Sequence, residues 1–314
     1  MSLTRRRLVQ GFGVLAAAPW FAGAAETARS GVAPLALPLA LRQIVNHIGI
    51  SVPDVVASAR FYSHVFDGPK LLGQVKPALR YSIGFYPGAM AIGGLSASDP
   101  SAPGGLPVPA PSEARSGAPH AFIDHFCMAA APFDLAAWRA RLDAERLRFF
   151  ARGTFVEVAG IPVQLLGGHE PSSHPAGAVA PKGAAGGGFH PMPPLYSGAP
   201  LVQAHGFAFV SLHVSELHEA TTLFRKLFGL TAPRATRGGL AFSLGDIELR
   251  LEQAADPEKA RIASYGIRVA RFDRSKLAEQ LTALGATIKA TSGRENRGLL
   301  RFADPDGIEC ELSG

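Results

Sequence analysis

Cysteine, charge and long apolar runs are all scarce in this sequence. The chain of 314 residues has only two cysteines, and charged residues make up 18% of it, with a formal net charge of +6. This charge is small and spread along the chain, so a nucleic-acid partner is not expected. Apart from the N-terminus, no segment is long and apolar enough to cross a membrane. What remains is the composition of a globular protein, long enough for two domains.

The N-terminus has the pattern of an export signal. Three arginines precede an apolar stretch that ends near Phe21, and the run AGA that follows offers a cleavage site. The start TRRRLV resembles a twin-arginine signal, and an ordinary secretory signal is the alternative. We therefore predict a signal peptide over residues 1–25 and a periplasmic or secreted mature protein. Its removal takes away the three arginines, so the net charge falls from +6 to +3.

One structural unit repeats four times along the chain. The stretch ISVPDVVASARFYSHVFDG aligns with LHVSELHEATTLFRKLFGL at an offset of 162 residues, and PFDLAAWRARLDAERL aligns with RFDRSKLAEQLTALGA at an offset of 139. Each copy reads as an alternating strand, an acidic residue at the expected helix N-cap, a helix and further short strands. We therefore predict an α+β fold with four βαβββ units, over residues 43–96, 120–167, 203–253 and 262–313.

Segments rich in Gly, Pro, Ala and Ser separate the copies. The longest, residues 168–202, is too rich in these residues to build a core, and we predict that it is an interdomain linker. This divides the mature chain into an N-terminal domain, residues 43–167, and a C-terminal domain, residues 203–314. The two cysteines, Cys127 and Cys310, fall in different domains, so we expect two free, buried thiols although an oxidising compartment permits a disulfide.

The repeated units resemble the vicinal oxygen chelate superfamily, which includes glyoxalases, bleomycin-resistance proteins and extradiol dioxygenases. The resemblance rests on NHIGISVPD and FYSHVF in the first unit and on DPDGIECEL in the last, and it covers residues 43–313. It implies that the four modules pair into two half-barrel domains of glyoxalase type. In such a domain, two modules face each other around a cavity.

His47 stands in a strand whose apolar residues alternate with polar or small ones. Ile48, Ile50 and Val52 lie on one face, so His47 lies on the other. His125 occupies the matching strand of the second unit.

The family places metal ligands on the first and last strands of a module. Carried over to this chain, the resemblance implies that His47, His125 and Gln164 are the metal ligands of the N-terminal domain. Gln164 stands where the family usually has a carboxylate, and where the last unit has Glu311.

Two imidazoles and one oxygen donor leave open positions for a substrate or O2. A neutral amide leaves the cation with a higher net charge, which makes it a stronger Lewis acid but holds it less tightly. Fe(II) or Mn(II) is the preferred ion and suits a ring-cleaving dioxygenase of extradiol type. Zn(II) or Ni(II) suits a glyoxalase-like isomerase or lyase. The substrate is expected to be a small molecule with two neighbouring oxygens, such as a catechol, an enediol or a 2-hydroxyketone.

The C-terminal half departs further from the ligand pattern. Phe209 replaces His47 and Ser264 replaces His125, so only Glu311 keeps a ligand-type side chain. His213 and His205 share strand parity with Phe209, and together with Glu311 they form a weaker candidate set. We therefore interpret residues 203–314 as a degenerate domain that supports the first one or covers its cavity.

Three tyrosines of the first unit are candidates for a catalytic hydroxyl. Tyr62 lies on the first predicted helix, and Tyr81 and Tyr86 lie on the strands that follow. A phenol that lines the cavity can donate a proton or a hydrogen bond to a substrate.

Two other classes of function are compatible with the same residues. Relatives that confer bleomycin resistance bind a ligand in the paired-module cavity without a metal, and the missing carboxylate at position 164 favours a periplasmic binding or sequestering protein of that type. A purely structural exported domain is the third reading, although two matched inward histidines would then need hydrogen-bond partners. No oligomeric state is predicted, because four modules already complete two cavities in one chain.

Overall fold

The computed structural model describes residues 44–67, 70–75, 78–85, 88–94, 120–130, 133–150, 154–167, 189–191, 195–256, 260–290 and 298–314. All of them lie in one compact unit, Leu37–Gly314. The predicted signal peptide, Tyr86 and most of the predicted linker lie outside the described residues. No helix within these ranges is long and apolar enough to cross a membrane.

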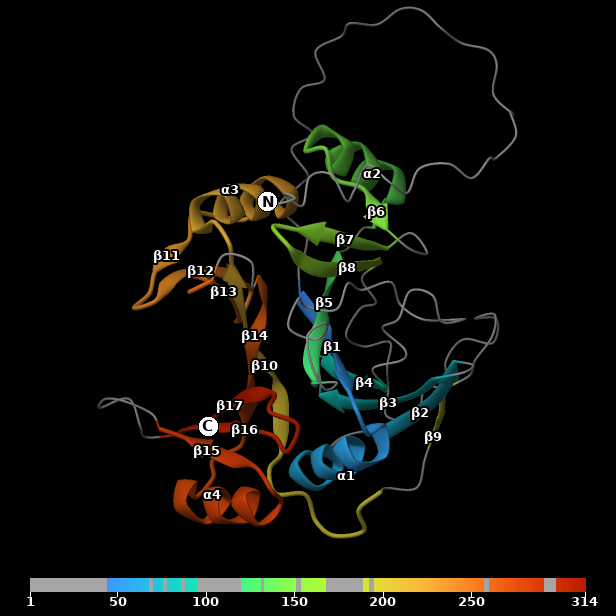
Figure 1. Cartoon of the computed structure of the whole chain (residues 1–314), viewed down its shortest axis with the longest axis vertical. Coiled ribbons are helices and arrows are strands. Elements are labelled where there is room, and N and C mark those ends of the chain that lie inside the picture. Colours follow the sequence, from blue (N-terminus) through green and yellow to red (C-terminus); the bar gives the residue numbers. More distant parts are fainter. Residues whose placement is uncertain are drawn as a thin grey trace, which may run out of the picture. The chain divides into compact units, whose positions relative to one another are not determined.

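Four βαβββ units follow one another along the described chain, as the repeat predicted (Figure 1). The first contains β1 (Ile44–Val52), α1 (Val55–Val65), β2 (Lys70–Val75), β3 (Ala78–Phe85) and β4 (Gly88–Gly94). The second contains β5 (Phe122–Ala130), α2 (Leu135–Ala144), β6 (Phe149–Phe150), β7 (Phe155–Val158) and β8 (Ile161–Gly167). The third contains β10 (Ala204–Val214), α3 (Leu217–Phe228), β11 (Arg234–Ala235), β12 (Gly239–Leu244) and β13 (Ile247–Gln253). The fourth contains β14 (Arg261–Val269), α4 (Arg274–Ala283), β15 (Thr287–Lys289), β16 (Leu299–Ala303) and β17 (Glu309–Ser313).

One short strand stands outside the four units. β9 (Phe189–Pro191) lies within the segment predicted to be a linker and pairs antiparallel with β2. Val202, at the end of the same segment, forms an isolated parallel bridge with Phe66. Parts of the segment therefore attach to the first unit, while its division of the chain into two domains stays a prediction.

The predicted acidic residues stand at the N-caps of all four helices, and three of them cap the helix through their side chains. Asp54, Asp134 and Asp273 each accept a hydrogen bond from a backbone N–H in the first turn of α1, α2 and α4. This satisfies donors that have no partner inside the helix. Glu216 is the N-cap residue of α3, as predicted, but its side chain makes no such bond. Its place is taken by Gln253 of β13, whose Oε1 accepts from the Leu217 N–H at 3.0 Å.

Alternation along β1 places its apolar side chains in the core, as predicted. Ile48, Ile50 and Val52 are completely buried, and so are Tyr62 and Val65 of α1. A helix that covers one face of a strand leaves the other face for the cavity. His47, Gly49 and Ser51 lie on that other face of β1.

Neighbouring units pair through their first strands. β1 runs antiparallel to β5 and parallel to β4, and β10 runs antiparallel to β14 and parallel to β13. β5 and β14 are in turn parallel to β8 and β17, the last strands of their own units. First strands therefore lie between last strands, and the first unit pairs with the second and the third with the fourth. Through β5 and β14, which share one residue pair, all seventeen strands of the described residues join in one sheet.

Helices of the first two units pack against the last two units. α2 lies beside α3 (Figure 1), where the Trp138 and Phe228 rings are 5.9 Å apart and Arg141 donates to the Leu227 carbonyl at 2.8 Å. α1 contacts the turn before β17, because the Tyr62 hydroxyl donates to Asp304 Oδ2 at 2.6 Å. Both halves of the chain therefore share buried contacts.

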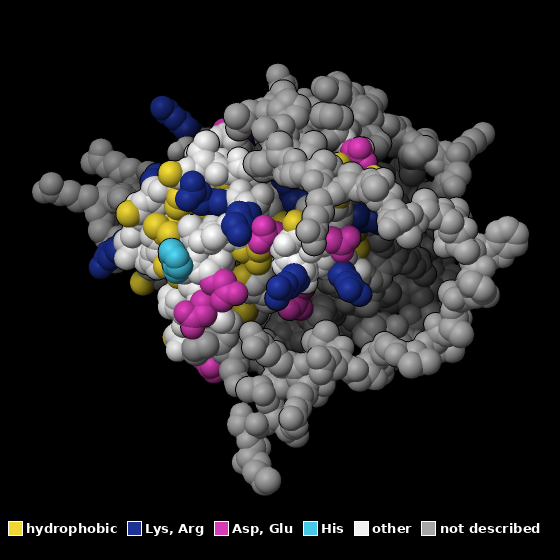
Figure 2. Space-filling model, turned by 90° about the horizontal axis from the view of Figure 1, so that it is seen from above, with side chains coloured by type: hydrophobic (Ala, Val, Ile, Leu, Met, Phe, Trp, Pro, Cys, Tyr) yellow, Lys and Arg dark blue, Asp and Glu magenta, His cyan; other side chains and the backbone are white. Residues whose placement is uncertain are grey.

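Basic and acidic side chains are interspersed on the described part of the face seen in Figure 2. Charges of both signs therefore lie close together on this part of the surface. This agrees with the low net charge of the sequence.

Candidate metal centre

Each candidate histidine follows an irregularity in the pairing of β1 with β5. Gly49 pairs with His125 and Ile50 with Ile123, which makes Asp124 an extra residue in the register of β5. An extra residue is a β-bulge, and it interrupts the alternation of side chains between the two faces. Asp124 and His125 therefore share a face although they are adjacent in sequence.

A second β-bulge occurs on the partner strand, β1. Val45 pairs with Met128 and His47 with Cys127, so Asn46 is the extra residue of β1. Each histidine thus has a polar side chain directly before it that points the same way.

These polar neighbours fix the two imidazole rings. His47 Nδ1 is 2.9 Å from Asn46 Oδ1, and His125 Nδ1 bonds to Asp124 Oδ1. Because carbonyl and carboxylate oxygens accept hydrogen bonds, each Nδ1 carries a proton and donates it. In the neutral form of either ring, Nε2 then carries the lone pair.

The two Nε2 atoms face each other at 3.1 Å. The rings meet edge to face, with centroids 5.2 Å apart, and His125 is only 3% exposed. Two lone pairs at this distance repel each other unless a cation lies between or beside them, and that cation is either a proton or a metal ion.

The spacing fits a shared metal ion. Imidazole nitrogens bind zinc-like cations at about 2.0–2.1 Å, so two of them on one ion stand about 3 Å apart when the angle at the ion is near 90°. An oxygen acceptor on Nδ1 of each ring is the arrangement that supports metal-binding histidines elsewhere. The spacing of His47 and His125 is therefore compatible with one shared metal ion, and their role as ligands stays a prediction.

Gly49 and Ser51 complete the support of His125. A Cβ at Gly49 would clash with the His125 ring and with Asp124 Oδ1, so only glycine leaves the ring its place. Ser51 Oγ donates to Asp124 Oδ2 at 2.7 Å. Asp124 is thereby held at both oxygens.

Gln164 lies on the same face but is not joined to the imidazoles. Cys127 pairs with His47 on one side and with Gln164 on the other, which places the three in one row across β1, β5 and β8. Among the described residues, no hydrogen bond joins the Gln164 amide to either ring. No group of three or more His, Cys, Asp and Glu side chains with metal-binding geometry occurs in the described ranges either. The third ligand stays a prediction.

Cys127 lies in this row as a buried thiol. It is completely buried, and burial raises its pKa well above the ordinary value. Both cysteines are free, as predicted. The thiol therefore stays protonated and packs as a small apolar group.

Small side chains border the histidines on the other side. β4 carries Ala89, Ala91 and Gly93 in register with His47, Gly49 and Ser51, and all three are half-buried. On the opposite face of the same strand, Met90 and Ile92 are completely buried. The side chains that β4 presents on the histidine face are therefore small.

The structure does not bring the predicted catalytic tyrosines to the histidines. Tyr81 pairs with Ile92, which pairs with Ile50, so it lies on the face that α1 covers. There its hydroxyl is 3.2 Å from Ser63 Oγ of α1.

Tyr62 is completely buried on α1 and donates to Asp304. Burial, with Tyr265 and Asp304 nearby, raises its pKa well above the ordinary value, so the hydroxyl stays protonated. Both tyrosines are placed to stabilise packing, and Tyr86 lies outside the described residues.

The second half keeps the bulges and loses the histidines. Ser211 pairs with Ser264 and Leu212 with Ile262, so Ala263 is the extra residue that corresponds to Asp124. Phe209 takes the place of His47, and its ring lies where a Cβ at Gly266 would clash. A phenylalanine ring therefore lies in the second half at the position that His47 has in the first.

The weaker candidate residues of the second half separate. His213 and Glu311 line one cavity, and His213 Nε2 is 3.8 Å from Glu252 Oε2. Glu311 pairs with Arg301 and Arg250. His205 is exposed and does not line this cavity, and two register shifts of β10 lie between Ala204 and Phe209, so simple alternation does not hold there.

Asn46, Asp124 and Ser51 were not predicted as part of the site. For Asn46 and Asp124 the signal in the sequence is a polar side chain directly before each matched histidine, in the dipeptides NH and DH. Strict alternation turns these side chains to the opposite face, and only the bulges return them.

Residues 206–312 match the family model described as the Glyoxalase/Bleomycin resistance protein/Dioxygenase superfamily. This part of the chain is therefore similar to the domains of that superfamily. The matched segment is the half without the paired histidines. A search of curated protein sequences finds no significant match.

Solved structures of similar fold cover 86% of the chain and so include the first half as well. One is the 2,3-dioxygenase LapB from Pseudomonas sp. KL28, with 13% identity, 91% of that chain covered and a TM-score of 0.50. A catechol 2,3-dioxygenase has 15% identity, 86% coverage and a TM-score of 0.51. BphC, a halotolerant catechol dioxygenase, has 12% identity, 85% coverage and a TM-score of 0.51. At these identities the likeness establishes the fold.

Proposed function

We propose that this chain is a metal-dependent enzyme that acts on a small molecule with two neighbouring oxygen atoms. The observation that carries the proposal is the pair of imidazoles whose Nε2 atoms are 3.1 Å apart and whose Nδ1 atoms are both held by oxygens. A ring-cleaving dioxygenase of extradiol type is the first activity to test, since solved catechol dioxygenases share the fold.

His47 and His125 would hold the metal through Nε2, with Gln164 as the candidate oxygen donor. Bound there, a divalent ion supplies Lewis-acid stabilisation of a deprotonated oxygen on the substrate. Fe(II) or Mn(II) is the proposed ion, and Zn(II) or Ni(II) is the alternative that suits an isomerase or lyase.

The surrounding side chains do three separate things. Asn46 and Asp124 keep the Nδ1 protons in place, so that both Nε2 atoms are available as ligands. Ser51 holds Asp124 through its second oxygen. Ala89 and Ala91 present small side chains on the histidine face of β4.

A metal-free binding protein is the second candidate. It is favoured by the neutral amide at Gln164 and by the lack of a third His, Cys, Asp or Glu in a metal-binding group within the described ranges. In that case one Nε2 carries a proton and donates it to the Nε2 of the other ring, and the pair needs no metal.

Oxygen uptake distinguishes these functions. The purified chain, reconstituted with Fe(II) or Mn(II), is given catechol, and a ring-cleavage product is followed by its absorbance. A dioxygenase consumes oxygen in step with product, and His125→Ala abolishes both. An isomerase or lyase instead turns over a hemithioacetal or enediol with Zn(II) or Ni(II), without oxygen. A binding protein saturates with ligand and turns over neither substrate.

We also propose that the mature protein is periplasmic or secreted, after removal of residues 1–25. The support is the order of arginines, apolar stretch and small residues at the N-terminus. Mass spectrometry of the protein from a periplasmic fraction tests this. A mature N-terminus near residue 26 is expected, and an intact N-terminus found only in the cytoplasm would contradict export.

A further inference from the structure

The second half has a cavity of about 190 Å³ at the positions that correspond to the metal centre of the first half. Its walls include Phe209, in place of His47, and Glu311, in place of Gln164. Water takes up about 30 Å³ per molecule in the liquid, so the space corresponds to about six waters or one small organic molecule.

Arg250 places a positive charge in this cavity. It stands on β13 in register with Ser211, as Ala91 stands on β4 in register with Gly49. Its guanidinium carbon lies 3.6 Å from the centre of the Phe209 ring, and Nη1 is 4.0 Å from Glu311 Oε1. The guanidinium therefore contacts two of the three positions that correspond to candidate metal ligands in the first half.

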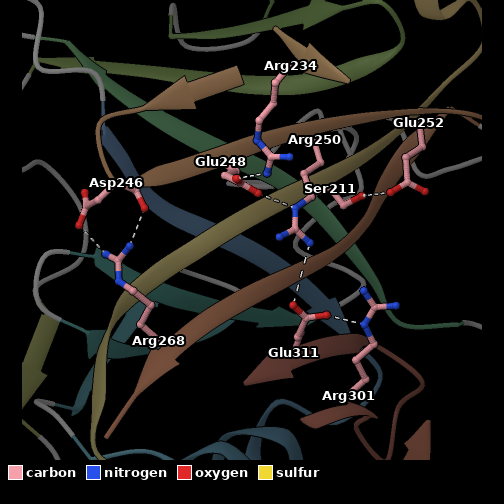
Figure 3. Close-up of polar contacts among 9 residues, drawn as sticks. All are labelled: Ser211, Arg234, Asp246, Glu248, Arg250, Glu252, Arg268, Arg301 and Glu311. Atoms are coloured by element: carbon pink, nitrogen blue, oxygen red, sulfur yellow. Dashed lines mark hydrogen bonds and ion pairs between the residues drawn. The ribbon is translucent and has the colours of Figure 1, made fainter. Parts of the chain in front are cut away.

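An alternating chain of charges fixes this guanidinium (Figure 3). Arg234 and Arg250 both pair with Glu248, Arg250 also approaches Glu311, and Glu311 pairs with Arg301. Although burial opposes it, the hydrogen bonds from Arg234 and Arg250 lower the pKa of Glu248. Three guanidinium groups and two carboxylates leave one positive charge in excess.

The excess charge is available at the cavity. Arg250 uses Nε for Glu248, and Arg301 uses Nε for Glu311. Within the described residues, no hydrogen bond uses Arg250 Nη2 or either Nη of Arg301. Glu311, which is only 6% exposed, forms ion pairs with both guanidinium groups. Planar guanidinium groups are well suited to binding a carboxylate.

The remaining lining does not cancel this charge. Lys289 lies 3.6 Å from Glu309, with which it pairs, and Glu252 lies toward His213 and accepts from Ser211 Oγ at 3.5 Å. Burial and Arg261 lower the pKa of His213, so that ring is neutral at pH 7. Arg261 also lines the cavity and balances the charge of Glu252, so the excess positive charge remains.

We infer that this cavity binds a small organic acid through its carboxylate, held by Arg250 and Arg301 without a metal. A single excess charge matches a monocarboxylate better than a phosphate group, which carries nearly two negative charges at neutral pH. This inference concerns the second half and does not depend on the proposed activity of the first.

Calorimetric titration of the full chain with benzoate tests the inference. Benzamide serves as the neutral isostere and inorganic phosphate as the competing anion. Benzoate is expected to bind with saturation, and benzamide and phosphate to bind far more weakly. Tighter binding of phosphate than of benzoate would overturn the assignment to carboxylates.

Three variants locate the binding. Arg301→Gln removes a charged donor and should weaken benzoate by about tenfold. Glu311→Gln removes the carboxylate that pairs with both guanidinium groups, so benzoate should bind more tightly. Arg268→Gln is the matched control, because Arg268 lies on β14 but pairs with Asp246 at 2.9 Å outside the cavity (Figure 3). It should bind benzoate as the wild type does.

The double variant His47→Ala/His125→Ala separates the two halves. It should keep benzoate binding, because the ligand lies in the other half. Loss of binding in this variant would assign benzoate to the histidine site and overturn the inference. So would the absence of binding to the wild type, or equal binding to Arg301→Gln and the wild type.

Discussion

Asp304 is a buried carboxyl group whose ionisation should oppose folding, and Asp304→Asn is the perturbation that tests this. The group is 3% exposed and lies in the turn between β16 and β17. Its Oδ2 accepts from Tyr62 at 2.6 Å, and its Oδ1 accepts from the backbone N–H groups of Asp306 and Ile308 at 3.0 and 2.7 Å. Asparagine keeps an oxygen for the two backbone donors and carries no charge.

Burial raises the pKa of Asp304 from 3.8 to about 6, more than its hydrogen bonds lower it. The folded state therefore holds the proton more tightly than the unfolded state does. The stability that this gives is fully present below about pH 4 and is lost as the pH rises through 6. The difference of about two pKa values corresponds to about 3 kcal/mol at neutral pH.

Urea unfolding between pH 4 and 8, followed by fluorescence, measures this effect. The free energy of unfolding of Asp304→Asn, relative to that of the wild type, should increase as the pH rises through 6, and a surface variant should show no such increase. Asp143→Asn on α2 is that surface variant, because Asp143 is exposed. If the wild type, Asp304→Asn and Asp143→Asn change in parallel between pH 4 and 8, the argument from burial is refuted.

Three further substitutions give separate tests. In Gly49→Ala the new methyl group displaces the His125 ring, and metal affinity should fall by about 10- to 100-fold in a competition titration. In Gly266→Ala the new methyl group clashes with Phe209 in the other half, so this variant should lose about 1–3 kcal/mol of stability and bind metal as the wild type does. An equal loss of metal affinity in Gly49→Ala and Gly266→Ala would refute the placement of the site. Trp138→Ala removes a buried ring between α2 and α3 and should cost about 3–5 kcal/mol in chemical unfolding, whereas a cost under about 1 kcal/mol would contradict that packing.

Local patterns predicted the units because the sequence repeats them. The alternation of Ile48, Ile50 and Val52 and the aspartates at three N-caps each depend on residues within one unit. Such short-range rules hold wherever the chain follows the regular geometry of a strand or a helix.

Features that join distant segments were not predicted. The bulges at Asn46 and Asp124 arise from the fit of β1 to β5, which no single strand specifies. Tyr62 was a candidate for a catalytic hydroxyl. Its hydrogen bond to Asp304 could not be foreseen, because the two residues are 242 positions apart in the chain. Arg250 was likewise not predicted as a site residue, because its position in the cavity depends on contacts with Phe209 and Glu311 from other strands.

Metal content tests the central claim most directly. Elemental analysis of the purified full-length protein, beside His47→Ala/His125→Ala, should find about one Fe, Mn, Zn or Ni per wild-type chain and none in the variant. Circular dichroism of both proteins checks that the variant is folded. Absence of metal from the wild type even after reconstitution, or equal metal in both proteins, would contradict the metal centre and leave a ligand-binding cavity as the better account.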